Sequence, residues 1–389
     1  MLNVLFVMYH DFTANSAVHV FHWANELSAQ GVSCAVAVPD NPKSINVLGD
    51  ARFGVLAFDE LGKENIFPNG QGPDIVHAWT PRENVRRFCL RLRETYSFRQ
   101  FIHLEDNEWH LLARMLGSPW KAIAAMTQQA LDSVVPLHLS HPFHGNAFIQ
   151  SADGVTVIID RLRELVPPNV PTIELWPSAD GGKFSPGAGG NAGSRLGLPS
   201  DATILVYTGN VHPANASEVR SLYLAVAILN REGHPTTLVR TGRDCCQFLG
   251  ADEAWGRAHA LELGYVPRTE IPNLLAAADI LVQPGRPDAF NDYRFPSKVP
   301  EFLATGRPVV LPASNIGLRM THGTDAFVLP KVDALAIVDA VRQIMGDPVL
   351  YQKLSSGARA FFEQHLNWAK SAHDLRCFYE RVILAPSVS

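Results

Sequence analysis

The alternation of apolar and polar segments along the chain predicts successive α/β units. Leu2–Met8 is an almost unbroken apolar run, which is typical of a strand buried on both faces of a parallel sheet. A helical pattern at 17–31 and a second apolar run at 32–38 follow, and this β-loop-α-β opening is typical of a doubly wound domain. The same reasoning predicts further strands at 74–78, 101–104 and 154–159, and an arginine-rich helix at Arg82–Arg99.

A change in composition marks a predicted boundary between two domains. The stretch around 167–200 is rich in Pro, Gly and Ser, so it should not form long regular structure. After this stretch, the alternation of apolar and polar segments that predicts strands and helices resumes. Strands are predicted at 203–207, 236–240, 261–265, 280–283 and 309–311, and helices at 217–230, 271–278, 332–345, 349–365 and 368–383.

Composition and charge narrow the class of protein. The 389 residues are 47% hydrophobic and 18% charged, which is enough apolar material for two cores. The net charge of −5 does not suggest a nucleic-acid partner. No apolar run reaches the roughly 18 residues of a membrane span. The cysteines lack a metal-type spacing and indicate reduced thiols in a cytoplasmic protein: Cys34, Cys89, Cys245, Cys246 and Cys377.

The stretch 283–311 carries distinctive chemistry and is predicted to be loop, short helix and strand. Ser297 is a candidate N-cap for a helix that begins at Lys298. The free N–H groups of that helix end, its dipole and the adjacent ammonium favour phosphate binding. Glu301, one turn further on, can accept hydrogen bonds from a ribose diol. An amphipathic helix without a ligand has a similar pattern, so this alternative stays open.

Polar residues and glycines follow neighbouring strands of the second domain. Glycine lets the backbone approach a ligand closely, and arginine binds phosphate oxygens with two parallel hydrogen bonds. Because the carboxyl ends of parallel strands share one edge of a sheet, these residues predict a pocket for a nucleoside diphosphate. Its predicted members are Gly209, Asn210, Arg240, Gly242, Tyr265, Val266, Tyr293, Arg294, Ser297, Lys298 and Glu301.

The order of these motifs resembles that of GT-B glycosyltransferases of the retaining glycosyltransferase family 4, also called glycosyl transferases group 1. The resemblance covers almost the whole chain and includes GPDIVHAWTP, HLEDNE, SADGVTVI, PSADGGKFSP, YTGN, LGYVPRTEIPNLLAAADILVQP and PSKVPEFLATGRPVV. It implies an α/β fold of two Rossmann-like doubly wound domains that face each other across a cleft. We expect an acceptor-binding domain at 1–168, a linker at 169–200, a nucleotide-sugar-binding domain at 201–366, and a C-terminal helix at 367–389 that packs back towards the first domain.

The resemblance also assigns roles by position. Glu301 matches the second glutamate of the family's E-x7-E motif, which holds the donor ribose, whereas the first glutamate is replaced by Tyr293. Lys298 belongs to a P-S-K-x-x-E variant of the motif, in which it is expected to contact the diphosphate. The family often has an arginine and a lysine near the glycine turn, and this chain has Asn210 and Asn215 there. The positive charge must then come from Arg240, Arg294, Arg220 or Lys298.

In the first domain, the resemblance places a residue that touches the transferred sugar at the end of the strand at 101–104. The predicted catalytic candidates are His103, Glu105 and Asp106, and the alternative is an acidic loop that caps a helix. The implied reaction is transfer with retention of configuration from a nucleotide-diphosphate sugar to a hydroxyl of a saccharide or lipid-linked acceptor. Surface polysaccharide or glycolipid biosynthesis is the implied setting, without a cofactor or an essential metal.

Two other functions remain open: a nucleotide-hexosamine epimerase on the same fold, and a non-catalytic sugar-nucleotide-binding partner subunit. The departures at Tyr293 and Asn210 suggest the second. His138, His141 and His144 lack an accompanying cysteine or carboxylate in the sequence, so no metal site is predicted there. Arg82–Arg99 is interpreted as a solvated helix face, with a peripheral contact to anionic lipid on the inner face of a membrane as the alternative.

Overall fold

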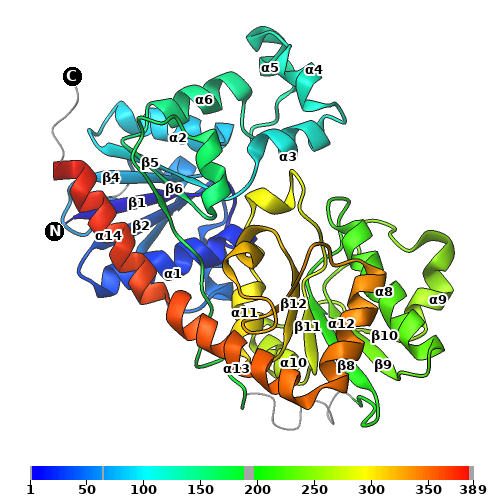
Figure 1. Ribbon diagram of the computed structural model, residues 1–389. Coiled ribbons are helices and arrows are strands. Elements are labelled where there is room, and N and C mark those ends of the chain that lie inside the picture. Colours follow the sequence, from blue (N-terminus) through cyan, green and yellow to red (C-terminus); the bar gives the residue numbers. More distant parts are fainter. Residues whose placement is uncertain (1, 64, 188–196, 385–389) are drawn as a thin grey trace. The chain divides into compact units, whose positions relative to one another are not determined.

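The computed structural model describes residues 2–63, 65–187 and 197–384, which fall into two compact units. The first unit contains the chain up to Pro177, the short segment Tyr293–Phe295, and the C-terminal segment from Trp368. The second contains Ser178–Asp292 and Pro296–Asn367. Each unit has its own parallel β-sheet with helices around it (Figure 1), so the predicted pair of Rossmann-like α/β domains is confirmed.

The first unit is built on a seven-stranded parallel sheet with the order β3-β2-β1-β4-β5-β6-β7. All five residues of β1 are buried, in agreement with the unbroken apolar run at the start of the chain. The strand order reverses between β1 and β4, and open α/β sheets bind ligands at the carboxyl ends of the strands at such a point. The strands are β1 (Asn3–Val7), β2 (Ser33–Val38), β3 (Gly54–Ala57), β4 (Ile75–Trp79), β5 (Arg99–Leu104), β6 (Gly154–Val157) and β7 (Thr172–Glu174).

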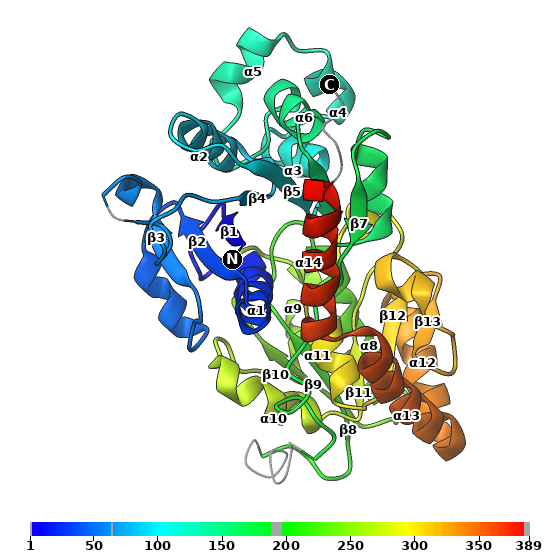
Figure 2. The same ribbon diagram turned by 90° about the vertical axis from the view of Figure 1, so that its left-hand side faces the viewer.

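Two long helices from opposite ends of the chain cover one face of this sheet. α1 (Asn15–Ala29) and α14 (Trp368–Leu384) lie side by side in both views (Figures 1 and 2). Both helices contribute to the apolar cluster that contains Val4 and Phe6 of β1. A hydrogen bond of 2.8 Å from Trp23 Nε1 to Ser371 Oγ joins them. The C-terminal helix is therefore part of the first unit.

The remaining helices of the first unit are shorter. α2 (Glu83–Arg93) contacts β4 and buries its apolar side. The other four helices are α3 (Glu108–Met115), α4 (Trp120–Ala124), α5 (Gln128–Val134) and α6 (Pro142–Gln150). Three of them, α3, α4 and α5, contribute to a small separate apolar cluster of Leu112, Ile123, Leu131 and Leu139, and α6 contacts α2. Across the described residues, none of the helices combines the length and the apolar character needed to cross a membrane.

The second unit has a six-stranded parallel sheet with the order β10-β9-β8-β11-β12-β13, which reverses between β8 and β11. Helices α8 and α12 pack against each other and share one apolar core with the strands. The strands are β8 (Thr203–Thr208), β9 (Thr236–Thr241), β10 (Ala260–Glu262), β11 (Ile280–Val282), β12 (Val309–Pro312) and β13 (Phe327–Leu329). The helices are α8 (Ala216–Arg231), α9 (Glu253–Arg257), α10 (Ile271–Ala276), α11 (Val299–Ala304), α12 (Ala334–Gly346) and α13 (Pro348–His365).

The structure differs from the sequence prediction mainly in short elements. β3, β7 and β13 have three or four residues each, which is too few for a clear periodic pattern. β7 lies within the segment predicted to be a linker and pairs with β6. The arginine-rich helix ends at Arg93 rather than Arg99, because Arg99 already begins β5.

Candidate functional site

In the second unit, glycine turns bring the carboxyl ends of three neighbouring strands together. Gly209 and Gly242 have φ angles of +138° and +96°, a region that side chains other than glycine rarely adopt. A Cβ atom on Gly242 would lie 2.4 Å from the carbonyl carbon and oxygen of Gly209, and the N–H of Gly242 donates to the carbonyl of Gly264 at 2.7 Å. Tyr265, which is exposed, and Val266 follow directly. The predicted residues after β8, β9 and β10 therefore share one backbone edge.

Lys298 lies beside the edge formed by Gly209, Gly242 and Gly264, which we call the glycine edge. Its Nζ donates to the hydroxyl of Tyr207 at 3.1 Å and lies 4.3 Å from the centroid of that ring. It is also 3.3 Å from the position that a Cβ on Gly209 would take. Within the described part of the chain, no carboxylate comes within ion-pair distance of Lys298. The structure thus holds an ammonium group at the end of β8, next to the point where the strand order reverses.

The predicted N-cap of α11 is wrong by one residue. The helix begins at Val299 with Lys298 in the N-cap position, and no side chain makes a capping hydrogen bond. Ser297 is exposed and lies one residue too early to cap. Since α11 has only six residues, its dipole is short, and the charge of Lys298 is the stronger attraction for an anion.

Glu301 lies one turn into α11 and is held by an arginine that sequence analysis did not single out. Arg268 Nη2 donates to Glu301 Oε1 at 3.1 Å. Burial raises the pKa of Glu301, and the charges of Arg268 and Lys298 act in the opposite direction. A ribose bound to this carboxylate would therefore share it with Arg268 or displace the guanidinium.

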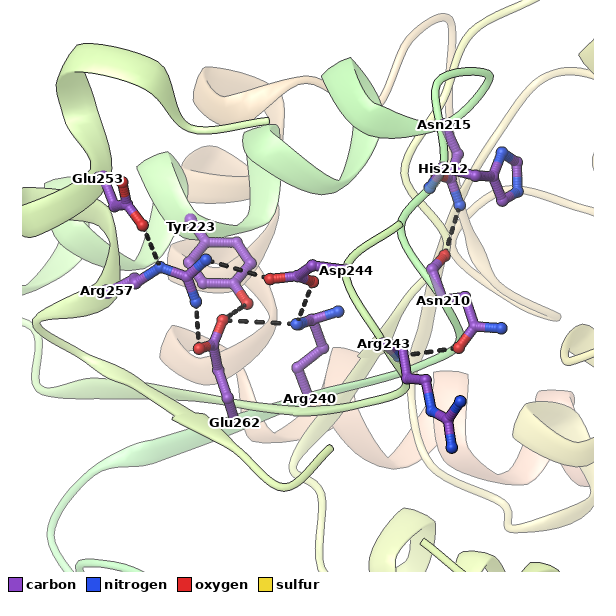
Figure 3. Close-up of polar contacts among 10 residues, drawn as sticks. All are labelled: Asn210, His212, Asn215, Tyr223, Arg240, Arg243, Asp244, Glu253, Arg257 and Glu262. Carbon is purple, nitrogen blue, oxygen red and sulfur yellow. Dashed lines mark hydrogen bonds and ion pairs between the residues drawn. The ribbon is translucent and has the colours of Figure 1, made fainter. Parts of the chain in front are cut away.

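The structure does not support the predicted role of Arg240 as a phosphate ligand, because this arginine lies in a network of charged residues (Figure 3). Its Nη2 lies 2.6 Å from Asp244 and 3.5 Å from Glu262, and the side chain is 3% exposed. Arg257 pairs with the same two carboxylates. Arg220, another candidate source of positive charge, pairs with an aspartate. These arginines stabilise the fold around β9 and β10. Among the described residues, Lys298 and the exposed Arg243, which directly follows Gly242, remain as cations without an ion pair at the glycine edge.

The asparagines that replace the family's arginine and lysine stabilise the loop after β8. Asn210 Oδ1 accepts the backbone N–H of Arg243 at 2.8 Å, and Asn215 Nδ2 donates to the carbonyl of Asn210 at 3.0 Å (Figure 3). They supply no charge. Tyr293 and Arg294 belong to the first unit, in which the Tyr293 hydroxyl donates to Glu164 at 2.8 Å.

In the first unit, a buried polar cluster surrounds Glu105 at the carboxyl ends of β1, β4 and β5. Ser16 Oγ donates to one carboxylate oxygen, and Trp79 Nε1 donates to the other at 3.0 Å. His19 Nδ1 lies 4.0 Å away, and the Tyr9 hydroxyl is 2.9 Å from Ser16 Oγ. Glu105 is thus fixed by α1 and β4. Trp79 is 1% exposed, so its indole serves this cluster and does not offer a surface to a sugar.

The three acids that follow β5 have different electrostatic surroundings. Burial raises the pKa of Glu105, which its hydrogen bonds and the charge of Arg82 partly offset. Burial and the charges of Glu105 and Glu108 raise the pKa of Asp106. Glu108 makes a two-point ion pair with Arg82, with a shortest distance of 3.0 Å, and accepts a hydrogen bond from Ser140. Ionisation of Glu105 and Asp106 is therefore coupled, while Glu108 has its own counter-charge.

His103 and Thr80 lie at the same edge but are fully buried. His103 Nδ1 is 2.8 Å from Thr156 Oγ1, its ring stacks on Trp79 at 3.9 Å, and burial lowers its pKa well below the usual value. The structure therefore does not support direct contact of His103 with a substrate. Thr80 has a φ of +74°, a strained conformation for a β-branched residue, and such strain is frequent at functional sites.

The Glu105 cluster predicts a pH dependence of stability. The pKa values of Glu105 and Asp106 are raised on folding, so the folded chain holds more protons than the unfolded chain above the ordinary carboxyl range. Their contribution is therefore complete at low pH and is lost as pH rises from about 5 upward. We expect Glu105→Gln to reduce this loss in urea unfolding measured in pH steps. A variant with the wild-type pH slope would contradict it, and Glu94→Gln, at an exposed position, is the control.

The predicted basic surface at Arg82–Arg99 is reduced by internal pairing. Arg82 is buried against Glu108, Arg86 pairs with Glu83, and Arg99 pairs with an aspartate. The exposed arginines of this stretch are Arg87, Arg91 and Arg93. A peripheral contact with anionic lipid stays a prediction and is restricted to these three.

Comparison with known proteins bears directly on the glycine edge. Residues 202–347 match the family model described as glycosyl transferases group 1. This segment is a glycosyl transferases group 1 domain. It contains Gly209, Gly242, Lys298 and Glu301. The Glu105 cluster lies outside the matched segment.

Similar proteins extend this comparison beyond the glycosyl transferases group 1 domain. D-inositol 3-phosphate glycosyltransferases of Saccharomonospora viridis and Stackebrandtia nassauensis are 25% and 29% identical over 238 and 228 residues, which cover 58% and 55% of this chain and 53% and 49% of theirs. The chain thus spans about half the length of the curated relatives it matches.

Solved structures show the same fold. Sucrose-phosphate synthase from Thermosynechococcus elongatus matches with a TM-score of 0.69 at 16% identity, covering 99% of this chain and all of the other. Anabaena HepE, in complex with UDP and glucose, matches with 0.70 at 14% identity, covering 98% of this chain and all of its own. The predicted GT-B fold class is confirmed.

Proposed function

We propose that this chain is a glycosyltransferase that moves a sugar from a nucleotide-diphosphate sugar to a hydroxyl of a saccharide or lipid-linked acceptor. The observation that carries the proposal is the position of Lys298, whose ammonium lies beside the glycine edge of the glycosyl transferases group 1 domain. A lysine without a carboxylate partner, next to backbone that a ligand can approach closely, suits the diphosphate of a sugar nucleotide.

The second unit supplies groups for each part of the donor. Lys298 is the proposed ligand of the diphosphate, and the backbone at Gly209 and Gly242 allows the phosphates to approach. Glu301 is the proposed acceptor of hydrogen bonds from the ribose hydroxyls, in exchange for its bond to Arg268. Solved HepE complexes contain UDP or UDP-glucose, which supports a sugar nucleotide as the ligand class for this fold.

The first unit supplies the proposed catalytic acid cluster. We assign Glu105 and Asp106 to the reacting sugar or the acceptor hydroxyl, since they follow β5, the neighbour of β4, at the edge of the sheet where the strand order reverses between β1 and β4. The bond from the acceptor oxygen to the anomeric carbon forms as the sugar–phosphate bond breaks. The hydroxyl proton balances the charge on the leaving oxygen, so no cofactor is consumed. Transfer with retention and without an essential metal is part of the proposal, with Lys298 stabilising the growing charge.

The proposed setting is the biosynthesis of a surface polysaccharide or glycolipid. Two kinds of similar protein support it. The curated relatives are D-inositol 3-phosphate glycosyltransferases, and WaaG, a structural neighbour with a TM-score of 0.64, is a glycosyltransferase involved in lipopolysaccharide biosynthesis. A peripheral contact at a membrane surface would fit a lipid-linked acceptor.

A non-catalytic sugar-nucleotide-binding subunit is the second candidate function. The observation that favours it is the use of Asn210 and Asn215 to hold the loop after β8, because neither replaces the missing charges of the family's arginine and lysine. Such a protein would bind the donor and show no turnover.

The test of both candidates is a panel of UDP, GDP, ADP and their common sugars in a thermal-shift assay, followed by sugar-release and transfer assays. A ligand that binds only the folded state raises the apparent stability. We expect one base to give a shift in the wild type, with turnover of its sugar conjugate. A shift without turnover would support the binding subunit, and the absence of any shift would contradict both.

A further inference from the structure

Three polar side chains from the small helices of the first unit point toward a common centre outside the sites described above. Asp132 lies in α5, His141 is the N-cap residue of α6, and His144 lies in the first turn of α6. One ligand atom from each lies within 4.8 Å of the other two. The carboxylate that the sequence pattern of the histidines lacked is therefore brought in by the fold.

The separations between these atoms fit tetrahedral metal coordination. Asp132 Oδ1 is 3.3 Å from His141 Nε2 and 3.1 Å from His144 Nε2. Zinc binds imidazole nitrogen and carboxylate oxygen at about 2.0–2.1 Å, which places neighbouring ligand atoms of a tetrahedron about 3.3–3.4 Å apart. Two of the three ligand–ligand edges already have nearly this length. Binding an ion would require only small adjustments of the side chains.

The second observation is that His141 has a buried ring nitrogen without a hydrogen-bond partner among the described residues. The side chain is 2% exposed. Within the described chain its Nε2 makes no hydrogen bond, although it lies only 3.3 Å from Asp132 Oδ1. Buried polar atoms normally have a partner. Its Nδ1 accepts the backbone N–H groups of Phe143 and His144 at 3.2 and 3.3 Å, which are long contacts. An ion at Nε2 would place the ring proton on Nδ1, so the ring would give up these two long contacts in exchange for its bond to the metal.

We propose that Asp132, His141 and His144 bind one divalent transition-metal ion of the zinc type. Two imidazoles and one carboxylate suit zinc, whereas magnesium and calcium prefer oxygen ligands. Three protein ligands leave a fourth position for water. The ion joins α5 to α6 across a loop and stabilises the part of the unit that has only a four-residue apolar cluster. This structural role is separate from the proposed sugar transfer, which needs no metal.

The test is a zinc titration of the chelator-treated full chain by calorimetry, with thermal unfolding as a second readout. We expect one ion per chain and a higher unfolding temperature with zinc. Asp132→Asn and His144→Gln should lower the affinity about tenfold or more. His141→Asn should do the same while keeping α6 stable, because asparagine is a good N-cap. His138→Gln, which changes an exposed histidine of the same loop, is the control.

A competing site on α14 must be distinguished. His373 Nε2 lies 3.5 Å from Cys377 Sγ, and both residues could attract zinc. Cobalt in place of zinc separates the two, because thiolate ligation adds a near-ultraviolet absorption band and the proposed site contains no sulfur. Visible cobalt absorption that is lost in His141→Asn and kept in Cys377→Ser supports the proposal. Binding that is unchanged in the three ligand variants, or that appears only with the thiolate band, overturns it.

Discussion

Lys298→Ala is expected to weaken the binding of the preferred nucleoside diphosphate by about 10- to 150-fold, the loss that corresponds to one charge-assisted hydrogen bond. Within the described chain, Lys298 has no ion-pair partner and is held at the glycine edge by Tyr207. Arg240 and Arg220 are paired with carboxylates. Arg243 is the other unpaired cation at this edge, but its side chain is exposed and makes no hydrogen bond or ion pair that holds it in place among the described residues. Calorimetric titration of wild type and variant with the nucleotide identified in the thermal-shift panel measures the change.

Two further variants separate charge from position. Tyr207→Phe removes the hydroxyl that holds Lys298 Nζ and keeps the ring beneath it, so it should weaken binding by a smaller factor than Lys298→Ala. Lys183→Ala removes an exposed lysine of the same unit and should have no effect. If Lys298→Ala binds the nucleotide within about twofold of wild type, the assignment of the diphosphate to this edge is wrong.

The fold followed from local patterns wherever an element was long and strongly apolar. Leu2–Met8 predicted β1 because a strand buried on both faces has no polar alternation. α3 to α6 were not predicted, because each has nine residues or fewer, and the small core beside α3, α4 and α5 joins positions as distant as Leu112 and Leu139. Elements of this length depend on tertiary packing more than on their own periodicity.

The candidate sites were predicted in position and only partly in role. Gly209 was identified because it follows a predicted strand, Lys298 because it begins a predicted helix, and Glu105 through the family resemblance at a strand end. Side-chain pairing could not be predicted. Arg240 looked available for phosphate until the fold placed Asp244 and Glu262 around it.

The contacts of the site residues were hardest to predict where the two hydrogen-bonded residues lie far apart in the sequence. Ser16 and Glu105 are 89 positions apart, and Arg268 and Glu301 are 33 apart. No spacing rule connects such residues. Thr80 gives no signal in the sequence either, since its strained backbone is imposed by the structure around it.

Glu105→Gln is expected to lower the rate of sugar transfer by about 100-fold or more, the range for loss of a group that handles protons or charge in the reaction. The substitution should keep the cluster intact. The glutamine oxygen can accept from Trp79, and its amide can donate to Ser16, which then donates to Tyr9 instead of accepting from it. The negative charge is lost while the packing remains, so the affinity for the nucleotide in the second unit should not change.

This combination of outcomes distinguishes a catalytic role from a structural one. Steady-state transfer measured with saturating donor should show a lower kcat, while titration with the nucleotide gives the wild-type Kd. Asp106→Asn tests the neighbouring acid in the same assay, and Glu94→Gln, on the exposed end of α2, should leave kcat unchanged. If Glu105→Gln transfers sugar within about threefold of wild type and Asp106→Asn does not, the reacting acid is Asp106. In that case the buried Glu105 serves to raise the pKa of Asp106 through its charge.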